Sequence, residues 1–166
     1  MSTNPNQATI DELAELAMVF ANASGSIATP AFVYEDEFIE TRCQHLKKIA
    51  GQANCKLLYS IKALTLPWVL DLIKPYVDGF SASSLFEAAT ARNVLQAEGT
   101  VHLTTPGLRP DQIGKISENC DYISFNTVSQ WLRHRDDMAK DMEIGLRVNP
   151  EVSFLDDPRY DPCRAY

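Results

Sequence analysis

Apolar and polar positions follow one another along this chain with two periods, about 3.6 residues in helix-like segments and two residues in strand-like segments. Residues 9–23 have apolar side chains near one helical face, and Thr9 is a candidate N-cap. Residues 22–28 are rich in Ser, Gly and Ala, which predicts a turn or linker. We therefore divide the chain into an N-terminal helix and linker, residues 1–28, and a main domain, residues 29–166.

The main domain alternates between strand-like and helix-like segments. An extended segment at 29–34 comes first, and the strands expected after it are 56–62, 79–84, 101–105, 121–126 and 144–149. The expected helices are 35–50, 66–76, 85–96, 110–118 and 128–140. Repeated strand–helix units predict an α/β fold with a parallel sheet, and residues 151–166 are expected to form a loop.

The carboxyl ends of these five strands carry polar or charged residues at nearly constant intervals of 21, 21, 22 and 21 residues. The five residues are Lys62, Ser83, Thr104, Asn126 and Arg147. Because side chains alternate between the faces of a strand, these residues share a face with other polar or small residues, and the opposite face is apolar. A doubly wound sheet would bury the polar face under helices at a large cost, whereas a (β/α)8 barrel turns it inward. The pattern therefore favours a barrel.

Five strands are fewer than the eight that such a barrel needs. The sequence thus predicts a partial (β/α)8 TIM-like barrel with about five of its eight strands. Three explanations stay open, namely that the sheet remains open, that the chain is a fragment, or that another chain completes the barrel.

Lys62 ends the run that begins at Lys56 and is expected to form a buried strand. Burial disfavours an ammonium group and lowers the pKa of a lysine, and a neutral amine attacks aldehydes. This chemistry points to a carbonyl cofactor such as pyridoxal 5'-phosphate. The alternative is a lysine at a strand end whose long side chain reaches water.

Other polar residues on the same face are candidates for binding. Arg147 is expected to point into the same space as Lys62, where it either binds anionic groups or pairs with a nearby carboxylate. The serines at 81–84 are possible hydrogen-bond partners, but Ser84 and Glu87 also fit a capping box for the following helix. His102 on this face is expected to be a core histidine with hydrogen-bond partners.

Composition narrows the class of protein. The chain has 166 residues and a net charge of −7, which argues against nucleic acid as a partner. No apolar run approaches the roughly 18 residues that a membrane helix needs, and no secretory signal is expected at the N-terminus. The four cysteines are far apart in sequence, which favours reduced thiols in the cytoplasm, and neither they nor the histidines have the spacing of a metal site.

Several segments resemble the fold-type III pyridoxal-phosphate enzymes, the family of alanine racemase and of the diaminopimelate, ornithine and arginine decarboxylases. The resemblance rests on residues 29–34, 59–63, 79–87 and 146–150. The Tyr-Asp-Pro-Cys-Arg segment at 160–164 narrows it to the carboxynorspermidine (carboxyspermidine) decarboxylases.

The resemblance implies that Lys62 is the catalytic Schiff-base lysine of pyridoxal 5'-phosphate. It also implies that Arg147, Glu87 and Ser81 lie beside the cofactor. Relatives of ornithine decarboxylase have an aspartate where Ser81 stands, so that position departs from their pattern. Family members continue to a Gly-rich phosphate site and a C-terminal β-domain, and neither can be placed in this sequence. Without the phosphate site, we expect weak cofactor binding and no activity of this chain alone.

Two hypotheses from different classes follow. In the first, the complete protein is a homodimeric, pyridoxal-phosphate-dependent carboxy-lyase that converts carboxynorspermidine or carboxyspermidine, small polyamine-like substrates, to norspermidine or spermidine. Diaminopimelate-type decarboxylation is the second choice within this class. In the other hypothesis, the chain is a non-catalytic truncated remnant or a subunit that pairs with a partner.

Overall fold

The structure is a computed structural model that describes residues 10–23, 32–150 and 152. It divides into two units, residues 1–35 and residues 36–166. The predicted boundary between residues 28 and 29, the Thr9 cap and the 160–164 segment lie outside the described residues.

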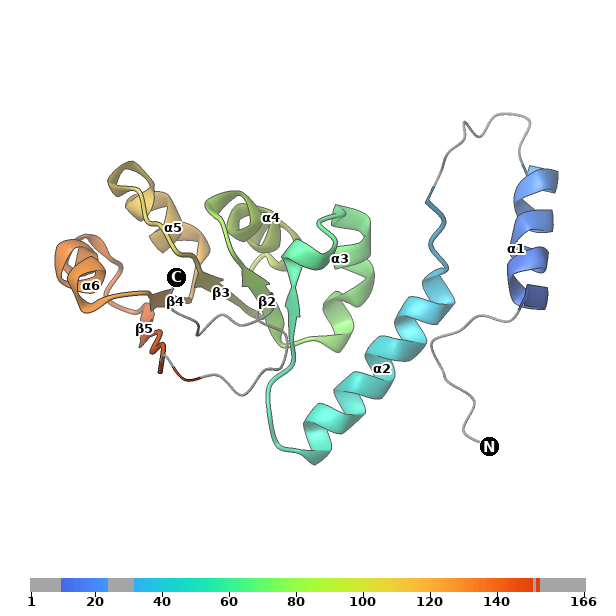
Figure 1. Cartoon of the computed structure of the whole chain (residues 1–166), viewed down its shortest axis with the longest axis horizontal. Helices are drawn as coiled ribbons and strands as arrows, with labels where there is room; N and C mark the ends of the chain where they lie inside the picture. Colours follow the sequence, from blue (N-terminus) through green and yellow to red (C-terminus); the bar gives the residue numbers. More distant parts are fainter. Residues whose placement is uncertain (1–9, 24–31, 151, 153–166) are drawn as a thin grey trace. The chain divides into compact units, whose positions relative to one another are not determined.

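The first unit contains helix α1 (Ile10–Ala23), close to the helix predicted there. The second unit contains five parallel strands and the helices between them (Figure 1). The strands are β1 (Leu58–Ser60), β2 (Gly79–Ala82), β3 (Thr100–Thr104), β4 (Tyr122–Phe125) and β5 (Glu143–Leu146). The helices are α2 (Asp36–Gln52), α3 (Pro67–Ile73), α4 (Leu85–Leu95), α5 (Ile113–Asn119) and α6 (Val128–His134). Short 3-10 turns are η1 (Ile61–Ala63), η2 (Lys74–Tyr76), η3 (Pro110–Gln112) and η4 (Arg135–Asp137).

The sheet has the order β1-β2-β3-β4-β5, so every strand pairs in parallel with the next one along the chain. Helices α3, α4, α5 and α6 follow one another along the same side of this sheet (Figure 1). This arrangement is that of a partial TIM-like barrel, as the strand–helix alternation predicts. Within the described residues, β1 and β5 are the two edges of the sheet.

The hydrophobic core lies between the sheet and these helices. Phe80, Val101 and Phe125 are fully buried on the helix-facing side of their strands. From the helices, Leu70 and Ile116 pack into the same cluster. Since burial of such side chains is the main driving force for folding, the alternation of apolar and polar residues decides which face the helices cover.

The predicted assignment of faces is correct, but its apolar side is not covered everywhere. Ile144 and Leu146 have about half of their surface exposed, at 47% and 49%. Both belong to the edge strand β5, whereas the preceding helix α6 packs on β4. The covering of the apolar face is therefore incomplete at this edge.

The prediction that a buried strand continues to Lys62 is wrong. Strand β1 ends at Ser60, and the backbone then turns through η1. The Ile61 carbonyl causes the turn, since it accepts hydrogen bonds from the Leu64 amide and the Thr65 hydroxyl, both at 3.0 Å. Ile61 is fully buried in the core, and Lys62 is exposed. The lysine therefore lies on the exposed side of a turn whose neighbouring isoleucine fixes it to the core.

Helices α4 and α6 begin with similar caps. The Ser84 hydroxyl accepts a hydrogen bond from the Glu87 amide at 3.2 Å, and the Thr127 hydroxyl accepts one from the Gln130 amide at 3.1 Å. Both follow the Ser/Thr-x-x-Glu/Gln pattern of a capping box. The cap predicted at Ser84 is thus present, and α6 has a similar one at Thr127. None of the described helices has both the length and the apolar composition required to cross a bilayer.

Candidate functional site

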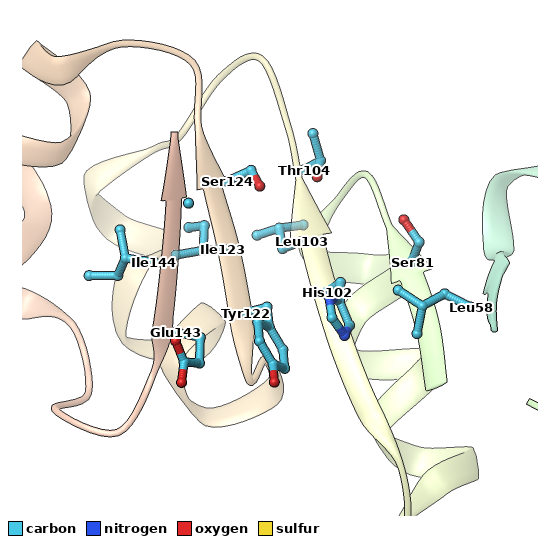
Figure 2. Close-up of a pocket in the computed structure, with 11 residues that line it drawn as sticks. Leu58, Ser81, His102, Leu103, Thr104, Tyr122, Ile123, Ser124, Glu143 and Ile144 are labelled. Atoms are coloured by element: carbon cyan, nitrogen blue, oxygen red, sulfur yellow. The ribbon is translucent and has the colours of Figure 1, made fainter. Parts of the chain in front are cut away.

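A row of polar side chains crosses the sheet on the face opposite to the helices. The strand register places these residues next to one another, in the order Ser60, Ser81, His102, Tyr122 and Glu143. They share a face because register partners in neighbouring strands point the same way. Four of them, all except Ser60, line a pocket of about 300 Å³ on this face (Figure 2).

His102 has a defined environment in this row. Its ring stacks on the Tyr122 ring, with centroids 4.0 Å apart and planes 4° from parallel. Its Nε2 atom lies 2.9 Å from the Thr100 hydroxyl oxygen. Partial burial lowers the pKa of His102; Asp121 raises it and Lys56 lowers it further, each with a smaller effect. The expectation of a core histidine with hydrogen-bond partners is met only in part, because the ring is half-buried and one of its two nitrogens has a partner among the described residues.

Lys62 lies just beyond the carboxyl end of β1. Its turn, η1, contacts both β2 and α4, the elements that carry Ser81 and Glu87. The premise that Lys62 is buried does not hold, so its exposure favours the alternative of a side chain that reaches water. Within the described residues, no carboxylate lies at ion-pair distance from this ammonium group. Its amine is therefore accessible from solvent.

Glu87 fixes the loop between β2 and α4. One carboxylate oxygen accepts a hydrogen bond from the Ser83 amide at 2.7 Å and another from the Ser83 hydroxyl at 2.9 Å. Together with the Ser84 cap, these bonds explain Glu87 as a structural residue. Ser83 is consequently held in one orientation at the carboxyl edge of the sheet, next to η1.

Ser81 and Arg147 occupy different parts of the sheet. Ser81 is half-buried in β2 and lines the pocket (Figure 2). Arg147 is exposed and follows β5, where its amide donates to the Phe125 carbonyl at 2.7 Å. Because β1 and β5 are opposite edges, the described residues bring Ser81 near the Lys62 turn but leave Arg147 across the sheet.

The loop after β4 is held by a second set of polar contacts. The Gln130 side chain accepts from the Asn126 amide at 3.0 Å and donates to the Pro106 carbonyl at 3.1 Å. The Asn126 side chain donates to the Thr105 carbonyl at 3.1 Å. Two neighbouring loops at the carboxyl edge are thus bound to each other.

The sequence placed His102 on the polar face, but its stack on Tyr122 and the positions of Thr100 and Glu143 were missed. The face of each strand follows from its alternation, whereas the pairing depends on the register between strands. Thr104 is the register partner of Ser124 and not of Asn126. The interval of 22 residues between Thr104 and Asn126 therefore did not identify register partners. The Thr-x-x-Gln pattern at 127–130 was the available signal for the second loop contact.

Comparisons with known proteins agree with the resemblance seen in the sequence. No family model matches the chain. The chain is 28% identical to a carboxynorspermidine/carboxyspermidine decarboxylase of Campylobacter jejuni over 140 residues, which is 84% of this chain and 36% of that protein. It is 32% identical to a carboxyaminopropylagmatine decarboxylase of Synechocystis sp. over 143 residues, which is 83% of this chain and 35% of that protein.

A solved structure is similar as well. It is the crystal structure of carboxynorspermidine decarboxylase from Campylobacter jejuni in complex with norspermidine, with a TM-score of 0.71 and 26% sequence identity. The similarity covers 76% of this chain and 34% of that one. The chain is therefore a homologue of carboxy(nor)spermidine decarboxylases, and it spans about a third of the length of the relatives that it matches.

Proposed function

We propose that this chain is part of a pyridoxal-phosphate-dependent decarboxylase that acts on carboxynorspermidine or carboxyspermidine in polyamine biosynthesis. The observation that carries the proposal is the similarity over 84% of the chain to a decarboxylase with this name. The norspermidine complex of the structural neighbour supports a polyamine as the product class.

Among the described residues, Lys62 fits the aldehyde group of pyridoxal phosphate. The Lys62 amine is exposed just beyond the carboxyl end of β1, the side of a (β/α) barrel at which active sites lie. Among the described residues it has no ion-pair partner that would compete with an aldehyde. When bound, the cofactor supplies an electron sink for the electron pair left by loss of carbon dioxide.

The chain's own residues have distinct tasks in this proposal. Lys62 binds the cofactor through its amine, and its turn is fixed because Ile61 is buried. Glu87 holds Ser83 beside that turn through two hydrogen bonds. Ser81 offers a hydroxyl on the pocket wall, and Arg147 offers a cation for anionic groups at the carboxyl edge.

A related substrate is a second candidate. The relative named carboxyaminopropylagmatine decarboxylase has 32% identity to the chain, against 28% for the Campylobacter relative. Both names describe a carboxylated substrate with a cationic tail. Loss of carbon dioxide from the two named substrates leaves norspermidine and aminopropylagmatine, respectively. Decarboxylation assays of the complete enzyme with each carboxylated substrate, compared by kcat/KM, will separate the two candidates.

We further propose that the complete enzyme is a cytoplasmic homodimer, which the family resemblance supports. Sedimentation equilibrium of the complete protein measures the oligomeric state directly. A monomeric mass over the working concentration range contradicts this part of the proposal.

Covalent trapping tests the role of Lys62 without a turnover assay. The chain is incubated with pyridoxal phosphate and reduced with borohydride, and peptide mass spectrometry locates the modified lysines. Lys56 and Lys62 are both exposed and flank β1, so Lys56→Ala is a matched control for Lys62→Ala. We expect Lys62→Ala to lose most of the label and Lys56→Ala to retain it. Equal labelling of both variants contradicts the assignment.

A further inference from the structure

The pocket on the inward face is lined by one carboxylate and no cation, although the Lys56 ammonium is near enough to lower the pKa of His102. Its lining includes the Glu143 carboxylate, the His102 imidazole and several hydroxyl groups, and it includes neither Lys nor Arg. Glu143 lies next to Tyr122 in the register, on the opposite side from His102 (Figure 2). A carboxylate beside an aromatic ring favours a cation, because both attract positive charge.

The hydrogen bond between His102 and Thr100 is compatible with a proton on Nε2 of the imidazole. The Thr100 hydroxyl donates to the Asp78 carbonyl at 3.5 Å. Its oxygen can accept from His102 Nε2, which lies at 2.9 Å, in the tautomer that carries the proton on this nitrogen. In a neutral imidazole with the proton on Nε2, Nδ1 is an acceptor. Among the described residues, Nδ1 has no hydrogen-bond partner.

The stack on Tyr122 holds this acceptor in place. The two rings are nearly parallel and belong to directly paired residues of adjacent strands. Tilting the imidazole out of this plane would break the stack, and flipping it within the plane would move Nε2 away from Thr100. The Tyr122 ring thus lies between the His102 imidazole, which it stacks on, and the exposed carboxylate of Glu143 in the neighbouring strand.

We propose that this pocket binds an ammonium group of a polyamine, with Glu143 as its counter-ion, the Tyr122 ring beside it and His102 as a hydrogen-bond acceptor. The proposal rests on the proposed function only for the identity of the amine. It assigns a binding site to residues apart from Lys62, and it concerns binding and not the chemical step. A neutral imidazole suits this role, since an imidazolium would repel the ligand.

The test uses the 166-residue chain with norspermidine as the probe, and titration calorimetry measures its dissociation constant. Glu143→Gln removes the charge and keeps the shape, so we expect about fivefold weaker binding or more. His102→Phe keeps a ring against Tyr122 but has no acceptor nitrogen, and we expect a similar loss. Glu37→Gln, an exposed carboxylate in α2, is the matched control for a general change in net charge.

Each outcome bears on the proposal separately from the decarboxylase assignment. Weakening by the two pocket variants alone supports the site. Equal weakening by Glu37→Gln means that binding follows the net charge of −7, which overturns it. Failure of norspermidine to bind, or binding that leaves the His102 nitrogen resonances unchanged, also overturns it. In all of these cases the labelling of Lys62 still decides the proposed function, because that label needs no amine ligand.

Discussion

Gly79 and Thr100 are paired residues of adjacent strands, and their backbones lie so close that residue 79 has no room for a side chain. A Cβ atom at this position would overlap the Thr100 carbonyl oxygen and lie 2.8 Å from its hydroxyl. We expect Gly79→Ala to lower the free energy of unfolding by about 2 kcal/mol or more, because backbone atoms cannot move aside cheaply. Urea unfolding measures the change.

Gly114→Ala is the control for that substitution. A Cβ atom at Gly114 meets no atom within 4 Å, and the residue lies in helix α5. Alanine has a higher helix propensity than glycine, so the expected change is a stabilisation of about 0.5–1 kcal/mol. Similar losses for both variants would show that the close contact between Gly79 and Thr100 does not limit stability.

The loop before α4 depends on one carboxylate. Glu87→Ala removes two hydrogen bonds to Ser83, and we expect it to lower the free energy of unfolding by about 1–2 kcal/mol. Glu118→Ala removes an exposed carboxylate from α5 and should cost less than about 0.5 kcal/mol. If the two variants are equally stable, Glu87 is not the residue that holds the loop.

The thiols should differ widely in reactivity. Burial raises the pKa of Cys120 to about 12, and burial raises the pKa of Cys43 as well, with a smaller effect from Glu40. The thiolate is the reactive form, so at pH 8 we expect Cys120 to react with iodoacetamide about 100-fold more slowly than the exposed Cys55. A time course by peptide mass spectrometry gives both rates. Comparable rates in the folded protein would contradict the burial of Cys120.

His102 gives the stability a pH dependence with a defined sign. Its pKa in the folded state is below the ordinary value of 6.5, mainly because of desolvation. The unfolded chain therefore binds a proton first as the pH falls, and stability decreases from about pH 7 through 6.5 toward the lower folded-state pKa. His102→Phe should show a smaller decrease between pH 7.5 and 5.5 than the unaltered chain. His45→Gln, at an exposed position of α2, is the control and should retain the full decrease.

The fold could be predicted largely because each face of the sheet has a simple pattern. Phe80 and Ala82 in β2, like Val101 and Leu103 in β3, alternate with polar residues, and all four are buried. The end of β1 could not be predicted in this way. Lys62 continues the alternation, but the turn depends on hydrogen bonds to the Ile61 carbonyl, which a pattern of side chains does not encode.

The sequence could predict individual residues of the site, but it could not predict the contacts between residues of different strands. Ser84 and Glu87 were recognisable as a cap because their partners lie within one helical turn. The stack of His102 on Tyr122 depends on register between two strands, and so does the position of Glu143. Contacts of this kind require the sheet to be aligned, whereas sequence periodicity supplies only the face on which each residue lies.

The order of the strands also bears on how this domain is made. Since β1 to β5 are neighbours in the sheet in the same order as in the chain, each strand pairs with a segment that has already been synthesised. Only one helical connection must close before each pairing forms, which keeps the entropic cost of every step small and equal. The sheet can therefore grow strand by strand as the polypeptide leaves the ribosome. At each step the new strand becomes the edge of the sheet, and the previous edge strand becomes an internal one.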